Sequence, residues 1–202
     1  EKINFCLVGE PTNPNKLGEM IKIGRRGSLT GKLTIFGLQG HVAYPQRANN
    51  PSTIIVKILK ELKDIKFDKG TKDFQPTNLE VTKININNTA DNIIPATAKA
   101  TFNIRFNNKH SSISIKKRLN KIFKKMSKKH KSKFKVEYRV SGEAFLTKPN
   151  KITFMVQRVI KKITKIRPKL STTGGTSDLR FIKAICPGLE FGLVVFTSGS
   201  LV

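Results

Sequence analysis

Cysteine is scarce in this chain of 202 residues: Cys6 and Cys186 are the only two, and each lies in or beside an apolar run. A pair so far apart in sequence does not form a disulfide framework, so we expect a reduced, cytoplasmic protein. No stretch approaches the roughly 20 apolar residues that cross a bilayer, which predicts no membrane partner. The opening residues EKINFCLVGEP contain neither a signal peptide nor a starting Met, and we expect the chain to begin inside a longer protein.

Acidic residues are also few: 13 Asp and Glu stand against 39 Lys and Arg, which gives a formal net charge of +26. Such a charge suggests nucleic acid as a partner. However, only nine of the basic residues are Arg, the residue that favours bidentate recognition of phosphate or base, and the excess is spread along the whole chain. We therefore predict no nucleic-acid partner and keep a basic nucleic-acid-binding module as the less favoured alternative.

Apolar residues are plentiful by contrast, at 38% of the chain with 13 Phe, which predicts a packed core. Strand and helix patterns alternate through the middle of the chain. The expected elements are a strand at 24–38, a helix at 51–65, strands at 78–87 and 97–106, a lysine-rich amphipathic helix from Ser112, and a strand at 134–140. This β-α-β-β-α-β order predicts a ferredoxin-like sandwich of helices on one antiparallel sheet.

The two ends of the chain have a different pattern. A short buried strand is expected at 5–8, and after Gly142 helices and strands alternate, as in an α/β domain. The expected elements there are a helix at 151–166, a strand at 170–172, a helix at 177–184 and a strand at 189–194. We therefore predict one α/β domain made of residues 1–23 and 142–202, with residues 24–141 inserted into it.

Two side chains at expected strand ends could carry chemistry. Glu10 follows the buried strand at 5–8, where open α/β sheets place their ligands, and its carboxylate could bind a metal or act as a base. A surface glutamate in a turn is the alternative, and one carboxylate cannot make a metal site. His41 follows a glycine-rich stretch and could donate a hydrogen bond to an oxyanion, or simply bond backbone within a turn. We expect His110 and His130, near the lysine-rich helix, to be solvated.

An anion site is a further candidate. The sequence TTGGTSD at 172–178 leads from a strand into a helix, and helix N-terminal N–H groups suit a carboxylate or phosphate; a simply capped helix start is the alternative. Arg25, Arg26 and Arg105 could clamp carboxylates through their planar forks, or could be exposed strand residues. No Ser-His-Asp or Cys-His pairing is evident.

These segments together resemble one family. They are Val8-Gly9-Glu10-Pro11, Gly24-Arg25-Arg26-Gly27-Ser28, Gln39-Gly40-His41-Val42-Ala43-Tyr44-Pro45, Asn92-Ile93-Ile94-Pro95 and Thr173-Gly174-Gly175-Thr176-Ser177-Asp178. Their order and spacing resemble the succinyl-diaminopimelate desuccinylases, within the M20 or aminoacylase-1-like metallohydrolases. The resemblance implies a partial di-zinc peptidase-like catalytic domain of the α/β class, with an inserted ferredoxin-like α+β sandwich that serves as a dimerisation domain.

The resemblance also implies an activity, the hydrolysis of N-succinyl-LL-2,6-diaminopimelate to succinate and LL-2,6-diaminopimelate in lysine biosynthesis. It implies two zinc ions in each active site, with cobalt possible, and Glu10 as a ligand to one of them. It implies that His41 reaches across a homodimer to stabilise the oxyanion, accompanied by Asn92. The residues that it implies for substrate binding are Arg25, Asn92, Arg105, Gly175 and Thr176.

The sequence departs from the family's pattern at both ends. The family's first metal-binding His-x-Asp, its bridging Asp and its Glu-Glu pair have no counterpart here, and no His follows Gly192-Leu193. We therefore expect a C-terminal fragment that is inactive alone and that pairs with a separate N-terminal fragment. The alternatives are a non-catalytic split-gene or decayed remnant that keeps the dimerisation module, and an enzyme similar to acetylornithine deacetylase.

Overall fold

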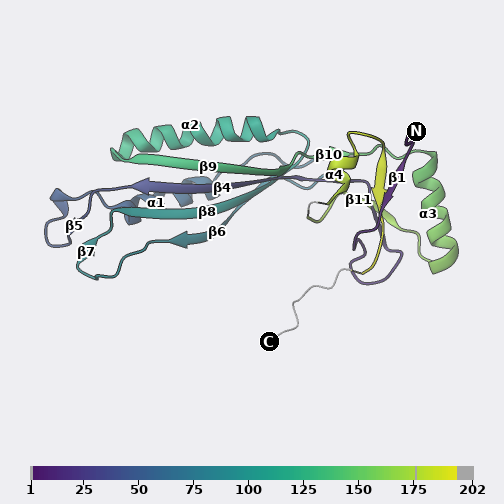
Figure 1. The fold of residues 1–202 in the computed structure, drawn as a ribbon, viewed down its shortest axis with the longest axis horizontal. Helices are drawn as coiled ribbons and strands as arrows, with labels where there is room; N and C mark the ends of the chain where they lie inside the picture. The colour runs from purple at the N-terminus through teal and green to yellow at the C-terminus, as the bar shows by residue number, and fades with distance from the viewer. Residues whose placement is uncertain (1, 176, 195–202) are drawn as a thin grey trace. The chain divides into compact units, whose positions relative to one another are not determined.

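The computed structural model describes residues 2–175 and 177–194, which form two compact units (Figure 1). Unit 1 takes its residues from 1–26, 70–75 and 142–202, and unit 2 consists of 27–69 and 76–141. Residues 24–26 and 70–75 cluster with unit 1 instead of with the inserted segment. The strand Gly24–Arg25 (β3) pairs there with Phe145–Leu146 (β10), and the Thr172 hydroxyl donates a hydrogen bond to the Asp73 carbonyl.

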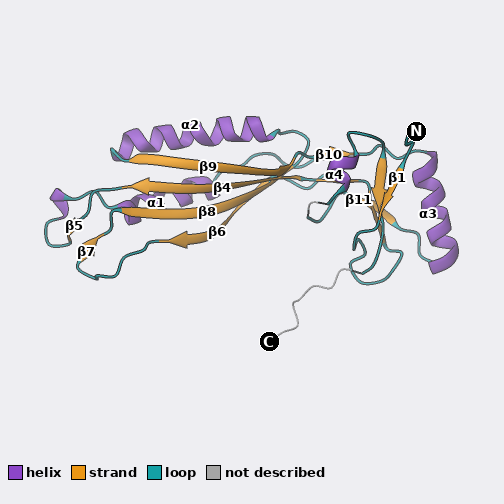
Figure 2. Cartoon of the chain, in the orientation of Figure 1, coloured by secondary structure: helices purple, strands orange, loops and turns teal. Residues whose placement is uncertain are grey.

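Unit 2 is a four-stranded sheet with two helices, in the element order that the sequence predicts (Figure 2). The strands are β4 (Gly27–Phe36), β6 (Asn78–Asn85), β8 (Thr97–Phe106) and β9 (Lys133–Gly142), arranged as β6-β8-β4-β9. β8 is antiparallel to both of its neighbours. Alternate residues of β8, from Ala98 to Phe106, are buried, so the helices cover one face. This arrangement confirms the ferredoxin-like sandwich.

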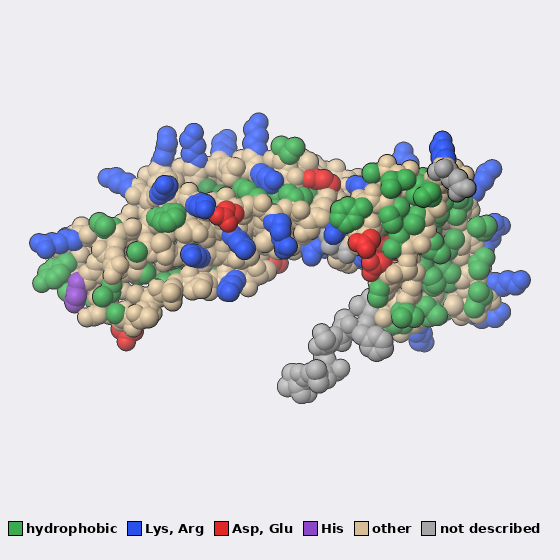
Figure 3. Space-filling model, in the orientation of Figure 1, with side chains coloured by type: hydrophobic (Ala, Val, Ile, Leu, Met, Phe, Trp, Pro, Cys, Tyr) green, Lys and Arg blue, Asp and Glu red, His purple; other side chains and the backbone are tan. Residues whose placement is uncertain are grey.

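The two helices of unit 2 begin at caps that the sequence supplies. In α1 (Pro51–Lys63) the Asn50 side chain accepts a hydrogen bond from the Ser52 N–H at 2.9 Å, and Pro51 occupies the first turn. In α2 (Ser112–His130) Ser111 and Ser114 form a capping box. Both helices bury an apolar stripe, while lysines stand out along α2 (Figure 3). The lysine-rich run is therefore the solvated face of an amphipathic helix, as predicted.

One end of unit 2 holds a second, small ladder. The strand β5 (Gly40–His41) pairs antiparallel with β7 (Ile93–Ile94), and a short 3-10 helix, η1 (Pro45–Arg47), follows β5. The Asn88 amide donates hydrogen bonds to the carbonyls of Ala90 and Ile93, at 3.0 and 2.7 Å, and so fixes the loop before β7.

Unit 1 has a sheet of four short strands in the order β1-β12-β2-β11. They are β1 (Cys6–Val8), β12 (Gly188–Glu190), β2 (Met20–Lys22) and β11 (Lys169–Ser171). The helix α3 (Lys151–Thr164) contributes Ile160 to a core with Ile21, Ile23 and Leu189. The helix α4 (Leu179–Ile182) has only four residues, whereas the sequence predicted a helix over 177–184. Turn residues 183–185 follow it, and β12 is likewise shorter than the predicted 189–194.

His110 and His130 are less exposed than the solvated positions that the sequence predicted for them. His110 Nε2 lies 3.1 Å from a carboxylate oxygen of Asp68, and its side chain is 19% exposed. His130 is half-buried, and its Nε2 has no hydrogen-bond partner within the described ranges. Burial, with the nearby charges of Lys57 and Lys129, lowers the pKa of His130 below its ordinary value.

Cys6 is half-buried, Cys186 is buried, and both are free thiols. Among the residues that the structure describes, no helix combines the length and apolar character needed to cross a membrane.

Candidate functional site

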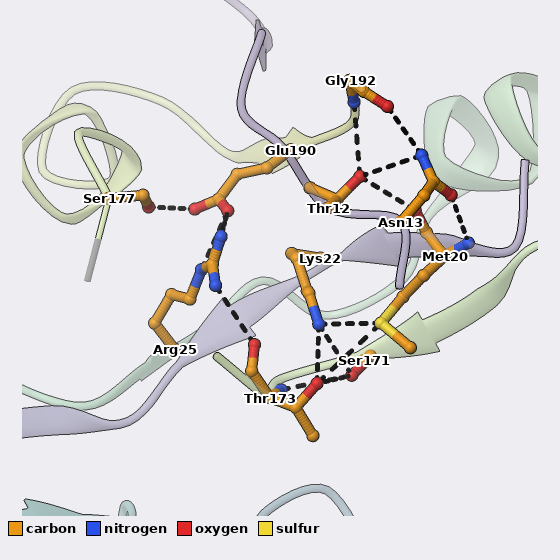
Figure 4. A network of polar contacts seen from close by, with 10 residues as sticks. All are labelled: Thr12, Asn13, Met20, Lys22, Arg25, Ser171, Thr173, Ser177, Glu190 and Gly192. Carbon is orange, nitrogen blue, oxygen red and sulfur yellow. Dashed lines mark hydrogen bonds and ion pairs between the residues drawn. The ribbon is translucent and has the colours of Figure 1, made fainter. Parts of the chain in front are cut away.

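A buried ion pair is part of the polar network of unit 1 (Figure 4). Arg25 ends β3 and is 6% exposed, and Glu190 ends β12 and is fully buried. Arg25 Nε donates to Glu190 Oε2 at 2.8 Å, and Nη2 donates to the same oxygen. A buried carboxylate is tolerated when it is paired and hydrogen-bonded in this way. The sequence-predicted carboxylate clamp, Arg25, thus holds a carboxylate of the chain itself.

The loop after β11 closes over this pair. Arg25 Nη1 donates to the Thr173 carbonyl at 3.1 Å, and Ser177, at the other end of the loop, donates its hydroxyl to Glu190 Oε1. Gly174 has a φ of +102°, a conformation that favours glycine, and a Cβ there would overlap Arg25 Nη1. The loop backbone therefore approaches the guanidinium closely. Because α4 has four residues, the predicted helix N-terminus offers little dipole to an anion.

A second buried cation lies beside the ion pair. Lys22, at the end of β2, is 5% exposed. Its Nζ donates to Thr173 Oγ1 at 2.6 Å, Met20 Sδ at 2.7 Å and Ser171 Oγ at 3.5 Å. These acceptors are neutral. Burial, and next the charge of Arg25, lower the pKa of Lys22 to about 8, although Glu190 opposes the shift.

Glu10 lies two residues beyond the end of β1 and is half-buried. Its backbone passes close to Gly192, where any side chain would overlap Glu10 backbone atoms. Asn13 fixes this junction, since its amide donates to the Gly192 carbonyl at 2.6 Å and its oxygen accepts from the Met20 N–H at 2.9 Å. Glu10 therefore stands at the edge formed by the ends of β1 and β12, although β1 is not the buried strand that was expected, since Leu7 is 55% exposed.

His41 and Asn92 come together at the small ladder of unit 2. His41 pairs with Ile93 in the β5–β7 register, and the Val42 N–H donates to the Asn92 carbonyl at 3.0 Å. Both His41 and Asn92 are exposed. The Ala43 N–H donates to His41 Nδ1 at 3.1 Å. Because Nδ1 is then the acceptor, a neutral imidazole carries its proton on Nε2 and can donate it there.

Arg105 lies in β8 of unit 2 and is half-buried. Its Nη1 has no hydrogen-bond partner in the part of the chain that the structure describes, and burial lowers its pKa below the ordinary value. Gly175 is exposed with open space around its Cα, and Thr176 lies outside the described residues. Within unit 1, the structure brings together Arg25 and the loop that leads to Gly175.

The peptidase dimerisation domain of the M20 peptidases matches residues 23–131. The chain belongs to the M20 family. This M20 chain is 80% identical over 194 residues to the succinyl-diaminopimelate desuccinylase of Pelagibacter ubique, covering 96% of the chain and 50% of that relative. It is 49% identical over 197 residues to the enzyme of the same name from Rickettsia bellii, covering 98% and 50%.

Solved M20-like structures have the same fold. A tripeptidase from Staphylococcus aureus superposes with a TM-score of 0.76 at 17% identity, over 94% of this chain and 48% of the other. An M20 metallo-carboxypeptidase from Sulfolobus solfataricus gives 0.69 at 15% identity, over 91% and 54%. The M20 chain thus spans about half the length of the curated relatives that it matches.

M20 family membership implies a divalent metal, and the residues of this chain can be tested against that. Zinc needs three or four nitrogen, oxygen or sulfur ligands. Among residues 2–175 and 177–194, no group of three or more His, Cys, Asp or Glu side chains could hold a metal ion. Glu10 is one carboxylate without such companions. The described part of the chain therefore does not fit a metal centre by itself.

Two buried charged residues of the network, Lys22 and Glu190, were not predicted from the sequence. Each is a charged residue in an otherwise apolar strand, Met20–Lys22 and Gly188–Glu190. A charge inside an apolar run is a weak signal, because a strand end that reaches solvent gives the same pattern. The pairing of β12 with β1 and β2 places Glu190 opposite Val8 and Lys22, and from there its side chain accepts the hydrogen bond of Arg25.

Proposed function

We propose that this chain is part of a metal-dependent amide hydrolase of the desuccinylase type, acting in the cytoplasm. Its substrate would be N-succinyl-LL-2,6-diaminopimelate, which it would cleave to succinate and LL-2,6-diaminopimelate. The observation that carries the proposal is the 80% identity, over 194 residues, to the succinyl-diaminopimelate desuccinylase of Pelagibacter ubique. Because the chain covers 50% of that relative, the proposal concerns the assembly to which this chain contributes.

The substrate's carboxylates would be held by Arg25, by Arg105 and by the loop of Gly175 and Thr176. Three observations support this assignment. Arg25 is buried beside a glycine loop. Arg105 has a guanidinium nitrogen with no partner in the described ranges. Gly175 has nothing within 4 Å of an added Cβ, so a ligand can approach its backbone. Arginine forks match the planar geometry of carboxylates.

His41 would donate its Nε2–H to the oxyanion that forms when the amide carbonyl is attacked, with Asn92 beside it. The Ala43 N–H on Nδ1 at 3.1 Å supports this role, because it leaves the proton of the neutral ring on Nε2. We propose that His41 acts on the active site of a second copy in a homodimer. The match of the dimerisation domain to residues 23–131 supports that assembly.

The metal in this proposal is zinc, with cobalt as the alternative, and Glu10 would be one ligand. One carboxylate does not make a site, so further ligands would come from outside the described residues. Unit 1 also exposes apolar side chains on α3, with Phe154 and Met155 each 49% exposed and Ile163 75% exposed. Such surface is typical of an interface. We propose that a polypeptide equivalent to the rest of the relatives' length covers it.

The test is an activity assay of the purified chain with Zn²⁺, alone and mixed with the half of the Pelagibacter ubique relative that it does not span. The chain alone should release no succinate, and the mixture should release succinate from N-succinyl-LL-2,6-diaminopimelate. Glu10→Gln should abolish release in the mixture, whereas Glu80→Gln, which alters an exposed ion pair with Lys63, should not. Failure of the wild-type mixture to cleave the substrate would contradict the proposed activity.

A second candidate is a dimerisation module without catalysis. The family match to residues 23–131 favours it, since that range lies mostly in unit 2. Sedimentation of the purified chain measures it directly. A dimer that remains inactive in every mixture would favour the module over the hydrolase.

A further inference from the structure

Glu190 connects the two parts of unit 1 that the proposed function assigns to substrate binding. Its Oε2 accepts hydrogen bonds from Nε and Nη2 of Arg25, and its Oε1 accepts from the Ser177 hydroxyl. Ser177 is 5% exposed and ends the loop that contains Gly174 and Gly175. One fully buried carboxylate therefore holds both the arginine and the C-terminal end of the glycine loop.

The way Arg25 uses its donors leaves part of its fork available. A guanidinium has five N–H groups. Nε and one N–H of Nη2 point to Glu190, and one N–H of Nη1 points to the Thr173 carbonyl at 3.1 Å. One N–H on Nη1 and one on Nη2 remain without an acceptor among the hydrogen bonds of the described residues. Glu190 thus fixes one edge of the guanidinium while other donors stay free for a ligand's carboxylate.

The glycine loop is held against the same guanidinium from its other end. The Thr173 carbonyl accepts from Arg25 Nη1, and Thr173 Oγ1 accepts from Lys22 Nζ at 2.6 Å. Gly174 lies so close to Arg25 that a side chain there would overlap Nη1. Both ends of residues 173–177 are therefore fixed relative to Arg25, the N-terminal end directly and the C-terminal end through Glu190 and Ser177.

We propose that Glu190 is a positioning residue for substrate binding, which holds Arg25 and the Gly174–Gly175 loop in register so that both reach one substrate carboxylate. The inference rests on the proposed function, because it takes Arg25 and the loop as the binding groups. It assigns Glu190 no contact with substrate. A misplaced fork costs affinity because bidentate recognition depends on the orientation of its planar donors.

A stability role alone makes a different prediction. Breaking a buried ion pair is destabilising, so part of the protein would unfold. Loss of folded protein lowers the apparent kcat and leaves KM unchanged. Loss of a correctly placed binding group, equally important in the ground and transition states, raises KM and leaves kcat unchanged. The split between KM and kcat therefore distinguishes positioning from simple stabilisation.

The experiment compares Glu190→Asp, Ser177→Ala and the matched control Glu80→Asp with wild type. Each protein is mixed with the half of the Pelagibacter ubique relative that this chain does not span, as in the activity assay above. Glu190→Asp keeps the charge and shortens the side chain by one methylene, so it retracts the anchor without leaving Arg25 unpaired. Ser177→Ala keeps the ion pair and releases the loop, which guards against a variant that does not fold. Glu80→Asp makes the same substitution at a side chain that is 58% exposed. Circular dichroism confirms the folded fraction of each protein.

The expected result is a KM raised about tenfold in Glu190→Asp and about threefold in Ser177→Ala, with kcat within about twofold of wild type, since a tenfold change equals about 1.4 kcal/mol. Glu80→Asp should match wild type in both constants. If wild type is active and KM is unchanged in both Glu190→Asp and Ser177→Ala, the positioning role of Glu190 is overturned while the proposed function stands. An inactive wild-type mixture overturns the proposed function, and with it this inference.

Discussion

Lys22 Nζ lies 2.6 Å from Thr173 Oγ1, the same residue whose carbonyl accepts a hydrogen bond from Arg25. Two buried cations therefore converge on one threonine, with Glu190 as the carboxylate that contacts Arg25. The ion pair compensates Arg25, whereas Lys22 has only neutral hydrogen-bond acceptors, including a weakly accepting thioether. This imbalance leads to a measurable dependence of stability on pH.

The first prediction concerns that dependence. The pKa of Lys22 falls from 10.5 to about 8 on folding, so between these values the unfolded state binds more protons than the folded state. Folding is therefore penalised fully below about pH 8, and the penalty disappears as pH rises toward 10.5. Between pH 7 and pH 10, the free energy of unfolding of wild type should rise by about 1–3 kcal/mol relative to that of Lys22→Met. Urea unfolding of both proteins at each pH measures it, and parallel profiles would contradict it.

The groups that face Lys22 do not change this sign. Arg25 and Glu190 face it as an ion pair, and the charge of Arg25 adds to the lowering of the Lys22 pKa whereas Glu190 opposes it. Met20, Ser171 and Thr173 do not titrate. The two proteins differ only at residue 22, so the difference between wild type and Lys22→Met isolates the buried amine.

A second prediction concerns Asp68, which joins three parts of unit 2. Its carboxylate accepts from the Asn107 amide at 2.7 Å and the Thr77 N–H at 3.3 Å, and it pairs with His110 at 3.1 Å. The side chain is 6% exposed. Asp68→Ala would remove one acceptor from each of these groups, and should cost about 2–4 kcal/mol of unfolding free energy. Asp64→Ala, at an exposed helix end, should cost much less; equal losses in urea unfolding would count against the cluster.

A third prediction tests the packing of the unit 2 sheet. A Cβ on Gly31 in β4 would overlap the ring of Phe102, which is fully buried in β8. Because a packed core does not absorb added volume freely, Gly31→Ala should destabilise the protein by about 1–3 kcal/mol. Gly9→Ala is the matched control, since nothing lies within 4 Å of a Cβ there. A thermal melt that shifts equally in the two variants would contradict the close approach.

Sequence patterns predicted unit 2 well because its elements are long and periodic. The strand expected at 97–106 is β8 with the same bounds, and the helices expected from 51 and from Ser112 begin at those residues. Unit 1 was harder, because its strands have only two or three residues each and show no period. The strand at 20–22 was not predicted, and the helix expected over 177–184 has only four residues.

The candidate site was predictable only in part, for the same reason. Motif residues such as Glu10, Arg25 and His41 stand beside recognisable turns and glycines. The partner of Arg25 is 165 residues away in sequence, and it meets Arg25 only through the pairing of β12 within the sheet. No local pattern specifies such a contact. Likewise, the prediction that His110 and His130 are solvated was wrong, because Asp68 and the residues that pack around α2 come from distant segments.

A last prediction tests the role of His41 in the proposed hydrolase. His41 is exposed and bonded at Nδ1 by the Ala43 N–H, so its removal should leave the thermal midpoint unchanged. If Nε2–H stabilises the oxyanion, His41→Ala should lower kcat about 100-fold in the active mixture, the usual loss for one oxyanion donor. Gln46→Ala, an exposed change in the adjacent η1, is the control and should retain wild-type kcat. If His41→Ala keeps the wild-type kcat, His41 takes no part in the chemistry. Its only role is then the turn in which the Ala43 N–H donates to its Nδ1.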